Sequence, residues 1–227
     1  MKLLSLETSS RNYSLAISHG SKVVVTQKFL LPRVLESSMM APIEKILKRA
    51  KMKLGDLDGF AVGLGPGAFT CLRAGLSTIK GLAFAAGKPV VGISSLDVLA
   101  MNIKGDAACI CTLGDAKRDL AFAAFYEKRG EILKRKSEYQ LTTIDEVLRQ
   151  VNTETVFIGD GIRVFHGQIK NASQYSLIKL AQEKLWIPQA RHLSFLAYQR
   201  FVKKDFDDIE TLIPLYLHPN DCQVRNT

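Results

Sequence analysis

Alternating and continuous apolar segments in the first third of the chain predict a sheet that starts with an antiparallel meander. A short apolar run covers residues 3–6, and residues 13–18 alternate between apolar and polar. A turn signal at 19–21 then precedes a third apolar segment at 23–29. Segments of this length, separated by glycine-containing turns, pair as neighbouring strands.

Two later segments have the spacing of amphipathic helices. The first carries Met39, Met40, Ile43, Ile46 and Leu47 at helical intervals, and Gly55 follows as a stop. The second, residues 69–86, is rich in small side chains, which let a helix lie close to its neighbours, and Gly87 ends it. The same half is completed by predicted strands at 60–62 and 90–93 and by a helix at 95–101 that Ser94 caps.

The second half repeats this plan in a shorter form. We predict a strand at 107–112 with a turn at 114–116, a hairpin of 121–126 with 131–139, a helix from Thr143 to about 151, a strand at 156–158, a helix at 194–203 and a last strand at 212–217. Thr143 and Glu146 form a capping box. The chain is therefore predicted to be an α/β protein with two lobes, residues 1–103 and a reduced lobe at 104–227.

Composition narrows the class of protein. The formal net charge of +9 permits an anionic partner such as RNA, although a solvated basic surface explains it equally well. No apolar run reaches the roughly 18 residues of a membrane span, and the first residues do not form a leader, so we expect a cytoplasmic protein. Four cysteines are too few for a disulfide framework, and Cys109 and Cys111 are expected to share a buried strand face.

A glycine-rich loop is the most distinctive local motif. Gly63, Gly65 and Gly67 surround Pro66 between a predicted strand and the helix that begins at Phe69. Glycine permits close backbone approach, and a helix N-terminus favours anions. The loop lacks the Gly-Lys-Ser/Thr ending of a P-loop. A phosphate site and a structural tight turn both remain open.

Several motifs together resemble the TsaB (YeaZ) family, and the matches run in order along almost the whole chain. They are Leu3-Leu4-Ser5-Leu6-Glu7-Thr8-Ser9, Gly65-Pro66-Gly67-Ala68-Phe69-Thr70, Leu72-Arg73, Val91-Gly92-Ile93-Ser94-Ser95-Leu96, Asp115-Ala116-Lys117, Gly159-Asp160-Gly161 and Pro214-Leu215-Tyr216-Leu217. The resemblance implies the actin-like, ribonuclease H-like (ASKHA) fold. It also implies a role in forming N6-threonylcarbamoyladenosine in tRNA.

The resemblance further implies that this chain is a subunit without catalytic residues of its own. It would pair with the paralogous transferase TsaD and work with the ATPase TsaE and with tRNA, and a homodimer of the isolated chain stays an open alternative. The expected TsaD-binding residues lie on the two amphipathic helices. They are Met39, Met40, Ile43, Leu47, Phe69, Leu72, Arg73, Gly75, Leu76 and Ile79. A vestigial nucleotide site would comprise Glu7, Gly65, Gly67, Asp115 and Gly159.

No metal or cofactor is expected. In TsaD a metal-binding HxxxH motif follows a comparable strand, and alignment on Val91-Gly92-Ile93 places Ser95 and Leu99 at its histidine positions. Leucine cannot bind a metal, and serine is a poor ligand alone. One alternative is a small ATPase or a sugar or acyl kinase of the same fold, for which Glu7 replaces the family's usual aspartate. A metal peptidase is a third hypothesis, and the sequence offers no HExxH motif for it.

Overall fold

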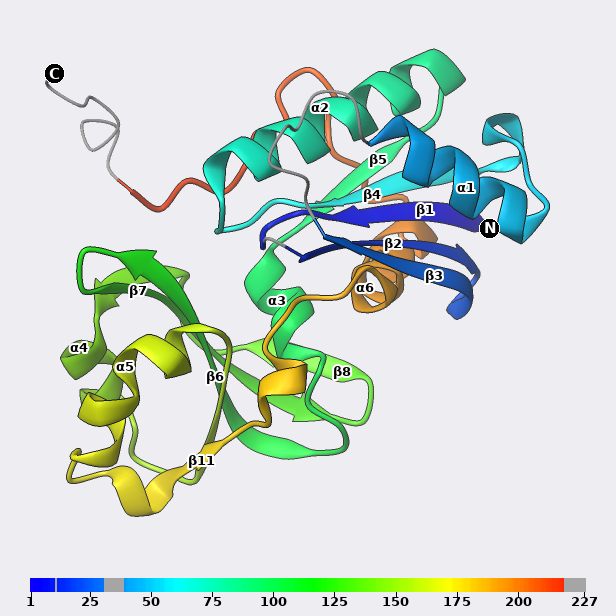
Figure 1. Cartoon of the computed structure of the whole chain (residues 1–227). Helices are drawn as coiled ribbons and strands as arrows, with labels where there is room; N and C mark the ends of the chain where they lie inside the picture. Colours follow the sequence, from blue (N-terminus) through cyan, green and yellow to red (C-terminus); the bar gives the residue numbers. More distant parts are fainter. Residues whose placement is uncertain (11, 31–38, 219–227) are drawn as a thin grey trace, which may run out of the picture. The chain divides into compact units, whose positions relative to one another are not determined.

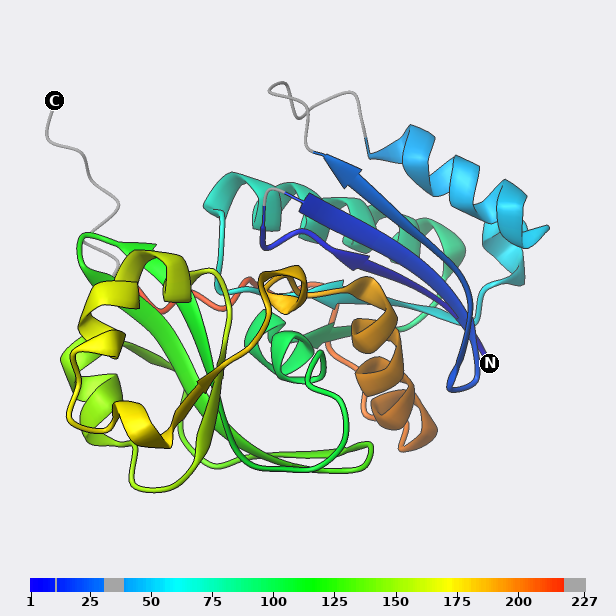
Figure 2. The same cartoon turned by 60° about the horizontal axis from the view of Figure 1, so that its bottom comes forward.

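The computed structural model describes residues 1–10, 12–30 and 39–218, and it contains two compact units (Figures 1 and 2). The first unit joins Met1–Val98 to a returning segment, Pro188–Pro214. The second comprises Leu99–Ile187 and the residues from Leu215 onward. The division predicted from the sequence differs in two respects, because it assigns residues 99–103 to the first lobe and the segment 188–214 to the second.

The first unit is built on a five-stranded mixed sheet with the order β3-β2-β1-β4-β5. The meander β1–β2–β3 is antiparallel, as predicted, and β4 and β5 add in parallel. The elements of this unit are β1 (Lys2–Glu7), β2 (Asn12–His19), β3 (Lys22–Leu30), α1 (Met40–Ala50), a 3-10 turn (Leu54–Asp56), β4 (Gly59–Gly63), α2 (Phe69–Ala86), β5 (Val90–Ile93) and α6 (Ala190–Val202), with α3 (Ser95–Ala100) at its boundary with the second unit.

Helices cover both faces of this sheet, which explains why its central strand β1 is buried from Leu3 to Glu7. Leu4 of β1 packs into the core beneath α1 and α2, whereas Leu3 packs with α6 on the opposite face. Figure 1 shows α1 and α2 on one side of the sheet and α6 on the other. Successive side chains of a strand point to opposite faces, so a strand buried on both sides reads as a continuous apolar run.

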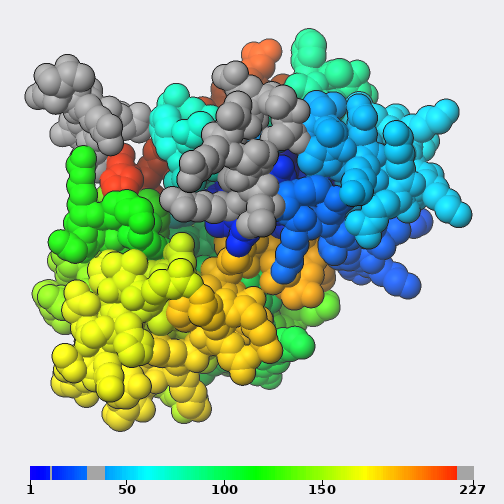
Figure 3. Space-filling model, viewed as in Figure 1, coloured from blue at the N-terminus to red at the C-terminus, as the bar shows by residue number. Residues whose placement is uncertain are grey.

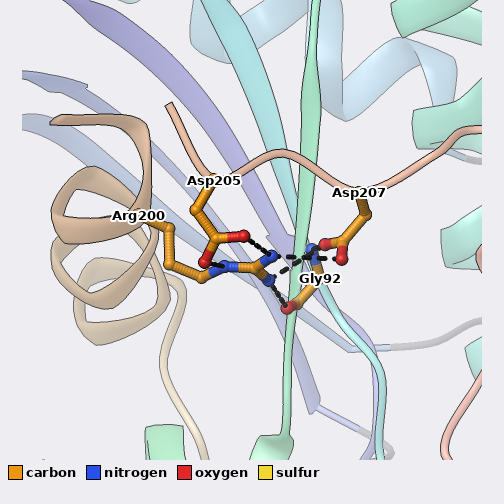
Figure 4. A network of polar contacts seen from close by, with 4 residues as sticks. All are labelled: Gly92, Arg200, Asp205 and Asp207. Carbon is orange, nitrogen blue, oxygen red and sulfur yellow. Dashed lines mark hydrogen bonds and ion pairs between the residues drawn. The ribbon is translucent and has the colours of Figure 1, made fainter. Parts of the chain in front are cut away.

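Side chains close the outer edge of β5 at the end of the sheet (Figure 4). Arg200 of α6 donates to the carbonyl of Gly92 over 3.0 Å, and Asp207 accepts from the amide N–H of Gly92 over 2.7 Å. Arg200 also pairs with Asp205 and Asp207, at 2.8 and 3.0 Å. These ionic hydrogen bonds hold the pKa of the Arg200 guanidinium above its usual range. The returning segment thus protects an edge that would otherwise present unpaired backbone groups.

The second unit repeats the sheet plan around its own core. Its order is β11-β10-β6-β7-β8, and β9 pairs with β7 as well. The elements are β6 (Ala107–Lys117), β7 (Leu120–Arg129), β8 (Ile132–Arg135), β9 (Gln140–Thr143), α4 (Ile144–Arg149), β10 (Thr155–Ile158), α5 (Gly161–Lys170), β11 (Ile178–Leu180) and 3-10 turns at Tyr175–Leu177 and Glu183–Leu185. Thr143 caps α4 by accepting from the amide of Glu146, as predicted.

Three sequence-based predictions for this half are wrong. Strand β6 continues through the predicted turn at 114–116, and the chain reverses only after it, where Lys117, Arg118 and Asp119 have positive φ. Helix α5 occupies a stretch between residues 158 and 194 for which the sequence analysis predicted no helix or strand. Residues 212–217 form no strand. The first prediction was based on turn-forming residue types alone. Gly114 and Asp115 instead pair regularly with residues of β7.

Candidate functional site

The glycine loop between β4 and α2 is held by the residues that follow β5. The carbonyl of Gly65 accepts hydrogen bonds from the Ser95 amide, at 2.7 Å, and the Ser94 hydroxyl, at 3.2 Å. The Gly65 amide donates to Oγ of Ser95 over 3.1 Å. Gly65 has φ +88° and precedes a cis peptide bond to Pro66. The loop is therefore a defined turn whose buried backbone groups bond within the protein.

The chain's own β1–β2 turn fills the inner side of this loop. A Cβ atom on Gly63 would lie 2.1 Å from Oε2 of Glu7, and one on Gly67 would lie 2.2 Å from the carbonyl oxygen of Ser9. The amide of Ala68 donates to that same carbonyl over 2.9 Å. Two of the three loop glycines are thus needed for contact with residues 7–9. This geometry fits the tight-turn interpretation of the loop.

Glu7 is locked inside the first unit. Its side chain is 1% exposed, and its carboxylate accepts from the Ser9 amide at 2.8 Å and from the Ser95 hydroxyl at 3.0 Å. Burial raises the pKa of the Glu7 carboxyl above its ordinary value, although the hydrogen bonds from Ser9 and Ser95 oppose that shift. A carboxyl in this setting serves to join β1 to the loop after β5.

The other expected nucleotide residues occupy the second unit. Asp115 lies in β6. Its carboxylate accepts a hydrogen bond from the backbone amide of Lys117 at 2.9 Å and forms an ion pair with the Lys117 side chain. Its own amide donates to Oδ1 of Asp160 over 3.2 Å. Gly159 has φ +130°, and a Cβ there would meet the carbonyl oxygen of Leu113 at 2.2 Å. The five expected residues therefore divide between two units, Glu7, Gly65 and Gly67 in one and Asp115 and Gly159 in the other.

Most of the residues expected to bind a partner are core residues of the first unit. Three are exposed, namely Met40 (47%), Phe69 (39%) and Arg73. The seven others are buried, namely Met39, Ile43, Leu47, Leu72, Gly75, Leu76 and Ile79. Helical spacing identified the apolar stripe correctly, but that stripe faces the sheet.

The solvent-facing side of α2 shows a different pattern, of which the sequence prediction included only Phe69 and Arg73. Arg73, Ser77, Gly81 and Phe84 recur at intervals of three or four residues, and all four are exposed. Phe84 is 81% exposed, and a Cβ on Gly81 would have no atom within 4 Å. The guanidinium of Arg73 lies 3.8 Å from the centroid of the Phe69 ring. The outer face of α2, defined here as Phe69, Arg73, Ser77, Gly81 and Phe84, thus has aromatic rings at both ends, with Arg73 and the small residues Ser77 and Gly81 between them. The available signal was that Phe84 falls outside the apolar stripe of the helix, whose buried members are Cys71, Leu72, Gly75, Leu76, Ile79, Leu82 and Ala83.

The two positions aligned with the metal-binding histidines of TsaD, Ser95 and Leu99, both lie inside the protein. Ser95 is committed to Glu7 and Gly65, and Leu99 is 3% exposed. Across residues 1–10, 12–30 and 39–218, no three His, Cys, Asp or Glu side chains are grouped so that they could hold a metal ion. The helices in the same ranges are all too short or too polar to cross a membrane.

The fold and this loop define a class of protein, the actin-like α/β proteins, and sequence comparison identifies the family. The chain belongs to the family of TsaD, tRNA N6-adenosine threonylcarbamoyltransferase, whose model matches residues 32–225. The resemblance to TsaB is confirmed as well. The chain is 25% identical to the tRNA threonylcarbamoyladenosine biosynthesis protein TsaB of Escherichia coli K12, over 97% of this chain and 96% of that protein. It is 23% identical to TsaB of Bacillus subtilis 168, over 99% and 97%.

Solved structures agree with this assignment and confirm the predicted fold class. A Pseudomonas aeruginosa protein described as similar to peptidase YEAZ matches with a TM-score of 0.83 and 25% identity, over 96% of this chain and 99% of the other. Component A of (R)-2-hydroxyglutaryl-CoA dehydratase from Acidaminococcus fermentans has a TM-score of 0.52 at 13% identity, over 89% and 99%. At that identity the second likeness concerns the fold alone.

Proposed function

We propose that this chain is a non-catalytic subunit for the biosynthesis of threonylcarbamoyladenosine in tRNA, acting in the cytoplasm as the partner of TsaD. Full-length similarity to proteins named for this biosynthesis supports the pathway. TsaD would transfer the threonylcarbamoyl group, while TsaE and tRNA would join the assembly. This chain would supply a folded surface rather than reacting groups.

The observation that carries the non-catalytic role is the closed network of Glu7, Ser95 and Gly65. These groups hydrogen-bond one another within the first unit, and Glu7 and Ser95 are each no more than 2% exposed. A residue that binds substrate or a metal–phosphate must offer free lone pairs to the ligand. Here the buried lone pairs and donors stabilise the turn that launches α2.

The outer face of α2 is the proposed contact with TsaD. A stable interface buries about 1,600 Å² in total and is centred on large apolar residues surrounded by close packing. Phe69 and Phe84 would provide the apolar anchors, and Ser77 and Gly81 would let a partner helix approach the backbone. Met40, which is exposed on α1, would add a further apolar side chain to the contact. In isolation the same face could pair two copies of this chain.

Reconstitution tests the functional assignment. The purified chain alone is expected to transfer no threonylcarbamoyl group to an unmodified tRNA transcript, and the reaction is expected to require this chain once TsaD and TsaE are present. Transfer by the isolated chain would overturn the non-catalytic role. A mixture of TsaD and TsaE that is equally active without this chain would overturn the subunit role.

Two matched variants test the location of the partner surface. Met40→Glu and Val164→Glu each place a carboxylate on an exposed helical position, because the two residues are 47% and 48% exposed. Met40→Glu is expected to weaken capture of TsaD at least tenfold, whereas Val164→Glu on α5 should not change it. Equal binding by both folded variants would exclude α1 from the interface.

A further inference from the structure

Positive charge is distributed unevenly along the molecule. Most of the net charge of +9 belongs to the first unit, and the densest basic segment of that unit covers residues 45–53. It contains Lys45, Lys48, Arg49, Lys51 and Lys53 and no acidic residue. The nearest acidic positions in the sequence are Glu44 before it and Asp56 after it.

All five basic side chains of this segment, called the α1 basic surface below, are exposed. Lys45, Lys48 and Arg49 stand on the side of α1 opposite its buried residues Ile43, Ile46 and Leu47. Lys51 ends the helix with φ +55°, so the chain turns and Lys53 follows beyond the helix end. Figure 3 shows α1, in light blue, with side chains that extend into solvent.

Known stabilising roles account for only part of this surface. Basic residues in the last helical turn favour the helix dipole, which explains Lys48 and Arg49. Lys45 lies earlier, and Lys51 and Lys53 lie after the helix. Within the described residues none of the five side chains forms an ion pair. Five unneutralised cations in nine residues repel one another, which a purely structural role does not require.

The hairpin of β7 and β8 offers a direct contrast. It is equally rich in basic residues, but Arg129 and Lys136 both pair with Glu127, at 2.7 and 2.8 Å, and Arg135 pairs with Glu138 at 3.6 Å. Hydrogen bonds and charges from Lys136 and Arg129 lower the pKa of the Glu127 carboxyl. The hairpin thus pairs Arg129, Arg135 and Lys136 with carboxylates, whereas no basic side chain of the α1 basic surface has such a partner among the described residues.

We propose that the α1 basic surface binds the phosphate backbone of RNA. The choice of RNA rests on the proposed function, whose substrate is a tRNA. Charge complementarity fits this partner, because lysine and arginine displace the counterions condensed on a nucleic acid. A protein partner fits less well, since protein interfaces are depleted in lysine and centre on apolar residues. Between Lys45 and Lys53 the apolar side chains Ile46 and Leu47 are buried.

The test compares two triple variants of the full chain that each lose three positive charges. One is Lys45→Gln, Lys48→Gln and Arg49→Gln on α1, and the matched control is Arg129→Gln, Lys134→Gln and Lys136→Gln on the hairpin. Fluorescence anisotropy follows binding of a labelled, unmodified tRNA transcript at several salt concentrations. The α1 variant is expected to bind at least tenfold more weakly, with a logarithmic salt slope smaller by about 2–3. The hairpin variant is expected to bind within twofold of the wild type.

The proposal is overturned if the α1 variant binds tRNA as tightly as the wild type does. Equal losses in both variants would show a response to net charge alone and would overturn the proposal, as would undetectable tRNA binding by the wild type at 50 mM salt. A parallel capture assay with TsaD separates this proposal from the proposed function. Lost tRNA binding with retained TsaD capture supports the RNA surface, whereas retained tRNA binding with lost TsaD capture would assign the α1 basic surface to the protein partner instead. Thermal melts check that the exposed substitutions leave the fold unchanged.

Discussion

The two faces of α2 use glycine in opposite ways. On the inner face, Gly75 lies against Thr8, which follows β1, and a Cβ there would be 2.3 Å from Oγ1 of Thr8. On the outer face, Gly81 has open space around the corresponding position. The inner glycine is explained by packing within the unit, but the outer glycine is not. A helix-interior glycine without a packing reason lowers stability, and the proposed contact of the outer face with a partner would supply that reason.

The largest expected effect is the loss of stability in Gly75→Ala. The added methyl group must displace Thr8, which is fully buried, and overpacking of this kind costs about 1–3 kcal/mol. Urea unfolding of the isolated chain measures the change. An unchanged midpoint would show that the inner face is looser than the contact with Thr8 implies.

Ser95→Ala is expected to cost slightly less. The variant leaves the Gly65 amide and the Glu7 carboxyl without the hydroxyl that both use, and one unsatisfied buried group costs about 1–3 kcal/mol. The control is Ser77→Ala on the exposed side of α2, which should leave the free energy of unfolding nearly unchanged. Equal effects would contradict the special role of the loop network.

Glu7→Gln should change how stability depends on pH. The folded-state pKa of Glu7 is raised, so the folded protein holds this proton more tightly than the unfolded chain does. The stability from this group is complete below the unfolded-state pKa, about 4.5, and falls as pH rises through the folded-state value. As pH rises from the unfolded-state pKa through the folded-state pKa, the free energy of unfolding of the variant should therefore increase relative to that of the wild type. Parallel curves of unfolding free energy against pH would contradict a buried, protonatable Glu7.

The smallest expected effect has the opposite sign. Gly81→Ala should stabilise the isolated chain by up to about 1 kcal/mol, because alanine restricts the unfolded chain and fits the helix without a clash. Thermal unfolding beside Gly75→Ala provides the comparison. Destabilisation by Gly81→Ala would mean that the outer face is already packed within the chain.

The sequence predicted α2 from residue 69 to residue 86 because its apolar period and its terminal glycine agree. The same periodicity could not distinguish core from interface. Leu72 and Leu76 match either role until the sheet beneath them is known. Phe84 was overlooked because one exposed aromatic does not alter the helical pattern.

Contacts between residues that are far apart in the sequence could not be predicted from the local pattern of apolar and polar residues. Glu7 and Ser95 are 88 residues apart, and only the parallel pairing of β1, β4 and β5 brings them together. The returning helix α6 was predicted as a helix, but its place beside Leu3 depends on tertiary packing. The family resemblance supplied the actin-like fold, which periodicity alone had left as an α/β protein with two lobes.

The most direct test of the central claim is the affinity of TsaD for Gly81→Arg, measured by calorimetry. The claim is that α2 packs inward through Gly75 and binds a partner through its outer face. Arginine at position 81 has room in the isolated chain and should leave its melting temperature within a few degrees of the wild type. We predict that affinity for TsaD falls at least a hundredfold. Wild-type affinity in the folded variant would contradict the account and place the partner surface elsewhere.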